Sequence, residues 1–219
     1  MEDETRELPW SKESVREGLE TAFAEKSEVK LLSILKENSF LFYELYSRKY
    51  GIQPAFHEVS LGNMRCDFAW LNDNSDGPEW VLVEIEKPGI NLFTKQGTPT
   101  AALNNAIEQV KSWEQYFSQH PSEKKRIFGA VKNFRFILVA GNEKDWQAPI
   151  PSRWRIHHNN TSSIEIRSLD VFWRALKVLE EKPGELWSFA EHPTTKSPSD
   201  LEAYWEAYGY MDFFRKILN

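Results

Sequence analysis

The chain has little cysteine, no excess of positive charge and no long apolar run. Cys66 is the only cysteine among 219 residues, which excludes an internal disulfide and a zinc site built from several cysteines. No stretch of apolar residues is long enough to span a bilayer, and the first residues lack the charged-then-apolar pattern of a secretion signal. We therefore expect a cytoplasmic protein with no membrane partner.

Acidic residues outnumber basic ones, 33 against 27, and the formal net charge is −6. This balance argues against a protein that coats nucleic acid through general positive charge. The charge is segregated, because acids dominate residues 1–30 and 180–219 whereas bases dominate 121–155. Hydrophobic residues make up 41% of the chain and nine residues are tryptophan, so the sequence indicates a folded protein with much aromatic packing.

The length suits one large domain, and the sequence has neither an internal repeat nor a low-complexity segment. We predict an N-terminal helical extension over 1–27, a main domain over 28–185 and a C-terminal helical tail over 186–219 that packs on the core.

The apolar pattern predicts a mixed α/β order of elements. Helical spacing of apolar residues predicts helices over 11–25, 28–48, 100–118 and 170–181. Alternating or continuous apolar residues predict strands over 55–61, 64–70, 80–86, 134–140 and 163–169. Gly62-Asn63 is typical of a two-residue hairpin turn, Gly51 fits the end of the second helix, and Ser199 with Glu202 fits a capping box in the tail.

Four acids fall on the predicted meander of strands. Glu84 and Glu86 alternate on one strand and so share a face, and the hairpin turn places Glu58 opposite Asp67. Like charges that face each other on a sheet are destabilising, which favours a bound cation. Carboxylate oxygens suit Mg²⁺ or Mn²⁺, and such a cation activates water for attack on phosphorus. The pattern therefore predicts metal-dependent hydrolysis of phosphodiester bonds.

Two other interpretations of these acids stay open on the residues alone. The acids decorate a solvated face of antiparallel strands, or two of them form the acid and base of a glycosidase. No other feature of the sequence indicates a cleft for sugar.

The segments around these acids resemble the PD-(D/E)xK nuclease superfamily, and more closely the nuclease domain of the Shedu anti-phage defence proteins. They lie between about residues 37 and 181 and read MRCDFAW, WVLVEIEKP, AIEQVKSWEQYF, FRFILVAGN and SIEIRSLDVFWRAL. The resemblance implies a restriction endonuclease-like αβββαβ core, in which helices flank a mixed central sheet.

The resemblance also implies a Mg²⁺- or Mn²⁺-dependent DNA endonuclease of prokaryotic anti-phage defence. Asp67 matches the metal-binding aspartate of the family, and Glu84 matches the first acid of the (D/E)xK pair, a second metal ligand. Gln109 matches the glutamine that many members place on the helix after the third strand. Glu37 or Glu44 corresponds to the acid of the first helix.

The chain departs from the family at the lysine of the motif. Glu86 occupies that position, and Lys87 follows one residue later, where strand alternation aims it at the other face unless the backbone bulges. Glu86 would then act as a base or a further metal ligand, because some restriction enzymes of the superfamily use Glu here. The alternative is a catalytically inactive module that kept the fold and binds DNA or a protein partner.

Basic side chains supply the expected DNA contacts, because Lys and Arg bind phosphates whatever the base sequence. The expected contacts are Arg65, Lys95, Lys111, Lys124, Lys125 and Arg126. A solvated loop is the other interpretation of the basic stretch 121–155. Nuclease domains of this type often need a second copy to cut both strands, so the resemblance implies a homo-oligomer, a dimer or higher.

Other reactive side chains are assigned structural roles. We predict that Cys66 is a core thiol, that Trp113 is a core residue and that His157 and His158 lie in a polar loop. The aromatic run over 204–214 either docks on the body of the protein or forms a homodimer contact, and a C-terminal helix favours docking.

Overall fold

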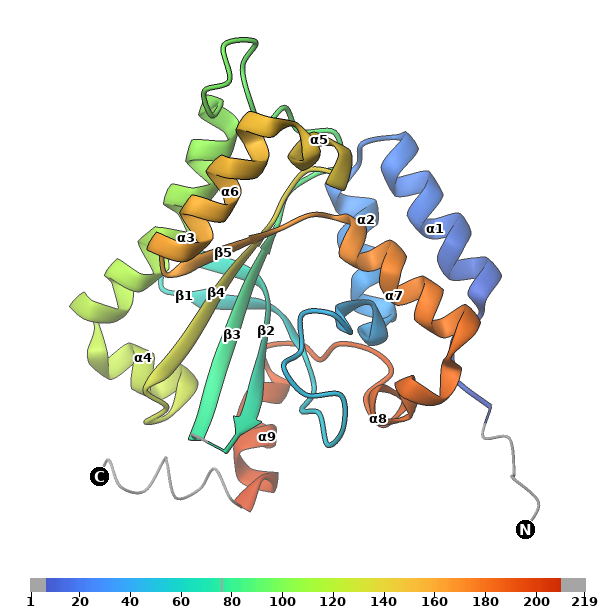
Figure 1. Cartoon of the computed structure of the whole chain (residues 1–219). Helices are drawn as coiled ribbons and strands as arrows, with labels where there is room; N and C mark the ends of the chain where they lie inside the picture. Colours follow the sequence, from blue (N-terminus) through green and yellow to red (C-terminus); the bar gives the residue numbers. More distant parts are fainter. Residues whose placement is uncertain (1–6, 76, 210–219) are drawn as a thin grey trace.

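A computed structural model describes residues 7–75 and 77–209, and a single mixed sheet lies at its centre (Figure 1). The strands, in their order across the sheet, are β1 (Phe56–Leu61), β2 (Met64–Asn74), β3 (Gly77–Ile85), β4 (Asn133–Val139) and β5 (Ile164–Arg167). The first three form an antiparallel meander, whereas β3, β4 and β5 run parallel. The predicted α/β fold with a mixed central sheet is confirmed.

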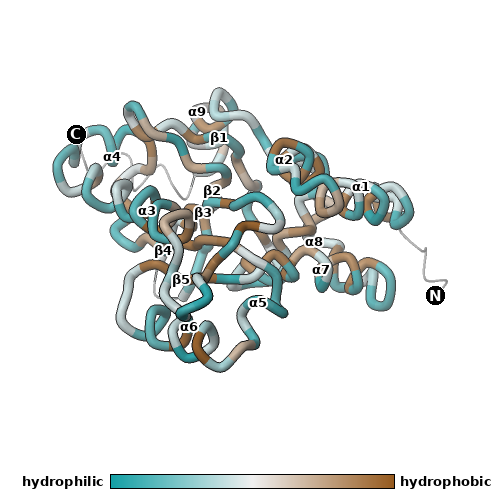
Figure 2. Tube along the Cα trace, turned by 90° about the horizontal axis from the view of Figure 1, so that it is seen from above, coloured by the Kyte–Doolittle hydropathy of each residue, from teal (hydrophilic) through white to brown (hydrophobic). Residues whose placement is uncertain are grey.

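Helices cover both faces of the sheet. On one face lie α1 (Lys12–Ala24), α2 (Glu28–Glu37), η1 (Ser39–Phe42), α7 (Asp170–Glu181), η2 (Pro183–Leu186) and α8 (Trp187–Ala190). On the other lie α3 (Ala101–Gln119), α4 (Pro121–Phe128), α5 (Glu143–Gln147), α6 (Pro149–Thr161) and α9 (Asp200–Ala207). Seen from above in Figure 2, α1, α2 and α7 project together from one side of the strands. We call the two apolar layers the α7-side core and the α3-side core.

The central strand explains why the sheet is buried on both faces. In β3, Val81 and Val83 point into the α7-side core, while Trp80 and Leu82 point into the α3-side core, and all four side chains are fully buried. An apolar residue at every position is typical of a strand with helices on both faces. The alternation continues to Glu84, which therefore faces α3 at the end of an otherwise apolar row.

The first two strands both change face midway along their length. Phe56 and Val59 lie in the α3-side core although they are three residues apart, and so do Cys66 and Ala69. Strict alternation would place such pairs on opposite faces. Glu58 accounts for the change in β1, because its φ of 54° lies in the left-handed region that non-glycine residues rarely adopt.

The prediction of one helix over 28–48 is wrong for the second half of this range. The α2 helix ends at Glu37, because Asn38 takes up φ −136° and ψ 75° and its side-chain amide donates to the Ile34 carbonyl at 2.9 Å. The chain continues through η1, whose side chains are buried, and reaches Gly51 in a turn (φ 60°) instead of at a helix end. The apolar residues after Asn38 thus pack through a 3₁₀ turn.

The loop assigned to His157 and His158 is also wrong, because both lie in α6. The sequence of α6 shows no clear helical spacing of apolar residues, since Pro151 is the only buried residue of this helix. Pro121 and Pro149 instead open α4 and α6 at a position where a proline costs no hydrogen bond.

The tail contains a further correction and a confirmed contact. The Ser199 side chain makes no cap hydrogen bond to α9, so the predicted capping box is wrong, and the side chain of Glu202 lies outside the described part. Tyr204 packs edge-on against Phe56 with ring centroids 5.4 Å apart. The rest of the predicted aromatic run after position 209, and the side chain of Trp205, are outside the described residues.

Several predicted features agree with the structure. Leu61 pairs with Met64 across the Gly62-Asn63 turn, as expected of a two-residue hairpin. The helix predicted over 170–181 matches α7. The division at residues 27 and 185 stays a prediction. None of the helices that the structure describes is long and apolar enough to cross a membrane.

Candidate active site

Asp67 and Glu84 meet where the β2–β3 ladder opens. The two strands pair from Asn74 and Gly77 as far as Phe68 and Val83. One residue beyond, Asp67 Oδ2 accepts a hydrogen bond from the Ile85 amide at 2.8 Å, so a side chain replaces the backbone partner that a continued ladder would supply. Asp67 is thereby fixed beside Glu84 at the carboxyl end of β3.

Glu84 is an acid buried almost completely. Its side chain faces α3, where the Gln109 amide donates a hydrogen bond to Oε1, and only 8% of the residue is exposed. Its other oxygen, Oε2, is buried and has no hydrogen-bond partner among the described residues. An unpaired carboxylate oxygen in a buried place is costly. The arrangement is therefore incomplete without a proton or a cation at Oε2.

Both acids hold protons more tightly than usual. Burial, and then the charge of Asp67, raise the pKa of Glu84 to about 9. Burial likewise raises the pKa of Asp67 to about 6, although the Ile85 amide acts in the opposite direction. Besides burial, the charge of Asp67 adds to the rise at Glu84, and the charge of Glu28 adds to the rise at Asp67. Raised pKa values of this kind often mark functional sites.

Glu86, and not Lys87, accompanies this pair. Both residues follow the end of β3, and the Glu86 amide donates to the Val139 carbonyl at 2.9 Å. Burial and the nearby Glu28 raise the pKa of Glu86, which the neighbouring Lys87 partly offsets. The Lys87 side chain is exposed to solvent.

Glu28, which the sequence did not single out, is the acid that helix α2 brings to the site. Its charge raises the pKa of Asp67, Glu84 and Glu86. Ser27 caps the helix by accepting from the Lys30 amide, so Glu28 stands in the first turn.

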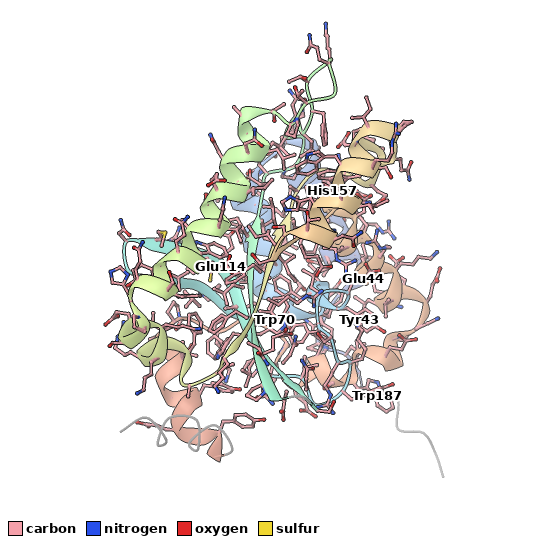
Figure 3. All side chains as sticks on the ribbon, turned by 60° about the vertical axis from the view of Figure 1, so that its left-hand side comes forward. Tyr43, Glu44, Trp70, Glu114, His157 and Trp187 are labelled. Atoms are coloured by element: carbon pink, nitrogen blue, oxygen red, sulfur yellow. The ribbon has the colours of Figure 1, made fainter. Side chains whose placement is uncertain are left out.

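One further contact helps to explain the position of α2. The turn before α2 packs against Gly89, where a Cβ atom would lie 2.9 Å from the Lys26 side chain. The other two candidate acids lie elsewhere in the chain: Glu37 is in the last turn of α2, and Glu44, beyond η1, pairs with Arg174 at 2.7 Å. Figure 3 shows Glu44 on the side of the sheet away from α3.

Glu58 forms ion pairs with basic side chains and is not grouped with the other acids. Its carboxylate lies 3.3 Å from Arg65 and 3.4 Å from Lys36, with more than a third of the side chain exposed. Arg65 in turn lowers the pKa of Asp67 and of Glu84, so it is the cation nearest to the acids among the predicted DNA contacts. The role of Glu58 as a metal ligand stays a prediction, which these ion pairs do not favour.

The residues present fit a divalent cation that takes few protein ligands. Within the described ranges, no group of three or more His, Cys, Asp or Glu side chains is arranged to hold a metal. Mg²⁺ often binds through one or two carboxylates and completes its shell with water and phosphate oxygens. Glu84 Oε2 and the Asp67 carboxylate would be those ligands, because Oε2 has no hydrogen-bond partner among the described residues and the charge of Asp67 raises the pKa of Glu84.

The remaining predicted DNA contacts fall in two regions. Lys95 lies in an exposed turn of the segment between β3 and α3, where the Gly97 amide donates to the Thr94 carbonyl. Lys111 pairs with Glu108 on α3. The α4 residues Lys124, Lys125 and Arg126 precede β4, and therefore lie at the end of the sheet opposite to Glu84 (Figure 1).

Two of these α4 residues already have partners. The Lys124 ammonium stands 4.3 Å from the centroid of the Phe134 ring, and Arg126 pairs with Glu123 at 2.9 Å. Elsewhere, Cys66 and Trp113 are fully buried, so their predicted core positions are confirmed.

The family model described as Shedu protein SduA, C-terminal, matches residues 25–173, about two thirds of the chain. The matched range begins just before α2 and ends within α7, so it contains the whole sheet and every acid described above. A search of curated proteins found no match.

Proposed function

The chain belongs to the family of Shedu SduA C-terminal domains, and from this premise we propose that it is a Mg²⁺- or Mn²⁺-dependent DNA endonuclease. Membership of the family supports a role in anti-phage defence. Phosphodiester hydrolysis by this chain, its metal and its DNA partner are our proposals.

One observation carries the proposal above the others. Glu84 is a buried acid with an unpaired oxygen, and it stands beside a second, partly buried acid, Asp67, whose charge raises the pKa of Glu84. A solvated sheet face would leave such acids exposed to water, and a glycosidase would need a sugar cleft between them. A cation-binding pair accounts for the burial, the repulsion and the unpaired oxygen together.

The side chains of the site take separate parts in the proposed reaction. Asp67 and Glu84 would hold the cation, which supplies charge stabilisation at phosphorus and lowers the pKa of a bound water. Gln109 fixes Glu84 through its hydrogen bond to Oε1 and leaves Oε2 directed to the ligand. Glu86 would take a proton from the attacking water, because its raised pKa improves it as a base.

The proposed substrate is DNA, held by exposed basic side chains. Arg65 and Lys95 are the first candidates for phosphate contacts, since the charge of Arg65 acts on both acids and Lys95 is exposed in the segment that follows β3. Lys124, Lys125 and Arg126 would contact a longer duplex, or a second copy of the chain in a homo-oligomer.

The test is cleavage of a supercoiled plasmid in Mg²⁺ and in Mn²⁺. We expect cleavage by the wild type and a loss of about 100-fold or more in Asp67→Asn and Glu84→Gln. Gln109→Ala should lose about 10- to 100-fold, because it orients a ligand without being one. The matched control is Glu108→Gln, which neutralises an exposed acid on α3 next to Gln109.

Each result decides between the two candidate functions. Undiminished cleavage in Asp67→Asn and Glu84→Gln would show that the site is assigned to the wrong residues. No cleavage by the wild type in either metal, together with retention of a labelled duplex on a gel, would favour the inactive DNA-binding module. The replacement of the family's lysine by Glu86 is the observation that keeps this second candidate open.

A further inference from the structure

A polar cavity of about 430 Å³ opens at the edge of β5, in a region to which no function has been assigned above. Three arginines line it, each from a different element: Arg155 from α6, Arg167 from the end of β5 and Arg174 from α7. Glu143 is the only acid of the lining, so the walls carry a net charge of +2 in a chain whose total is −6. Three guanidinium groups thus line one concave place, each with a carboxylate partner.

Two of the arginines are held in place by acids outside the cavity lining. Arg174 bonds Glu44 through Nε at 2.8 Å and lies 2.7 Å from it through a terminal nitrogen, and Arg167 pairs with Glu165. A guanidinium has five N–H donors and a carboxylate engages two of them at most. These ion pairs therefore fix the two guanidinium groups and leave donors for a ligand.

The third arginine shows what kind of group the cavity accepts. Arg155 lies 3.3 Å from a Glu143 oxygen, and its guanidinium stands 5.1 Å from the Trp146 ring centroid. The other Glu143 oxygen accepts from the Ser168 hydroxyl at 2.8 Å. Although burial acts in the opposite direction, Ser168 and Arg155 lower the pKa of Glu143. An anionic oxygen is thus stabilised at this position by an arginine and a hydroxyl.

We propose that this cavity binds a phosphate group, carried by a small phosphorylated molecule or by the backbone of a nucleic acid. The rigid fork of arginine matches two oxygens of phosphate, and three arginines suit a dianion. The volume is within the range of small-molecule sites, about 300–1,000 Å³. Asn159 also lines the cavity, and its side-chain amide keeps one N–H donor beyond the hydrogen bond to the Ile166 carbonyl.

The cavity is separate from the carboxylate pair but lies at the same end of the sheet. Ile85, Val139 and Arg167 are neighbours across β3, β4 and β5. Two strand spacings place β5 about 10 Å from β3. The backbone source of the phosphate rests on the proposed nuclease function, whereas binding of a free phosphate does not.

The test is isothermal titration of the full chain with inorganic phosphate, and with a short DNA duplex in the absence of divalent cations. We expect saturable binding of phosphate that the double variant Arg155→Gln/Arg167→Gln weakens by about tenfold or more. Arg153→Gln, an exposed arginine of the same helix outside the cavity lining, is the matched control and should bind like the wild type.

A second variant makes the test independent of folding defects. Glu143→Gln removes the carboxylate that pairs with Arg155 and the only negative charge of the described lining, so it should bind phosphate several-fold more tightly than the wild type. Weakening of duplex binding alone by the double variant would assign the phosphate to a nucleic acid backbone. The proposal is overturned if phosphate does not bind and the double variant binds the duplex like the wild type, or if phosphate affinity is the same in all variants.

Discussion

Replacing Glu84 by glutamine should stabilise the protein in the absence of divalent cations and abolish the stabilisation that these cations confer. Glutamine keeps the shape of the side chain and an oxygen that accepts from Gln109, but it removes the charge that repels Asp67. The same substitution removes a proposed metal ligand. Stability without the cation and response to the cation should therefore change in opposite directions.

The magnitude follows from the pKa of Glu84, which burial and Asp67 raise from 4.5 to about 9. Between these values the folded chain binds more protons than the unfolded chain, so stability falls as pH rises. From pH 5 to pH 8 the fall can reach about 4 kcal/mol, at about 1.4 kcal/mol for each pH unit. We expect about 2 kcal/mol, because water near the partly exposed Asp67 screens part of the repulsion.

Urea denaturation at pH 5 and pH 8, with EDTA or with Mn²⁺, measures both effects. With EDTA, Glu84→Gln should be more stable than the wild type by about 2 kcal/mol at pH 8 and equal to it at pH 5. Mn²⁺ should stabilise the wild type and the control Glu108→Gln, but not Glu84→Gln. The reasoning is refuted if Glu84→Gln and the wild type lose the same stability between the two pH values, or if Mn²⁺ stabilises both equally.

Three substitutions test the packing that supports the site. Thr100→Ala should lower the free energy of unfolding in urea by about 1 kcal/mol, because the Thr100 hydroxyl caps α3 by accepting from the Leu103 amide. Thr100→Ser keeps a hydroxyl at this position and should retain most of that stability. Phe42→Ala should lower the free energy of unfolding by about 3–5 kcal/mol, since the ring is fully buried and its removal leaves a cavity. An equal loss of stability in Phe42→Leu would contradict this explanation. Asn159→Ala should lower the free energy of unfolding by about 2 kcal/mol, because the Asn159 side-chain amide pairs with both the N–H and the carbonyl of Ile166 on the edge strand β5. The unpaired edge should also promote self-association, which light scattering detects. A variant that stays monomeric and as stable as the wild type would argue against this.

The parts of the site that lie close together in the sequence were predictable. The turn at Gly62-Asn63 fixes the register of the hairpin, and alternation along β3 places Glu84 on the α3 face. The helical stripe of α3 then carries Gln109 to the same side. These relations depend only on backbone periods and a short turn, which local sequence specifies.

The parts that depend on long-range packing were not predictable. Glu28 reaches the site because α2 packs through Leu31 and Leu35 into the α7-side core and its preceding turn rests on Gly89. No local pattern distinguishes Glu28 from the other acids of the first thirty residues. The α6 helix was missed for a different reason, because a helix that buries almost no apolar residue leaves no periodic signal.

The site lies where the regular sheet rules fail, and this has a physical reason. Glu58 takes a left-handed backbone conformation opposite Asp67, and β2 changes face at the same level. The β2–β3 ladder ends next to this level, where the Asp67 carboxylate accepts from the Ile85 amide. Both the backbone strain and the charge repulsion destabilise the fold, so the apolar residues of the two cores must offset them. A strictly alternating hairpin would avoid both costs, and the proposed metal site is a function that would need them.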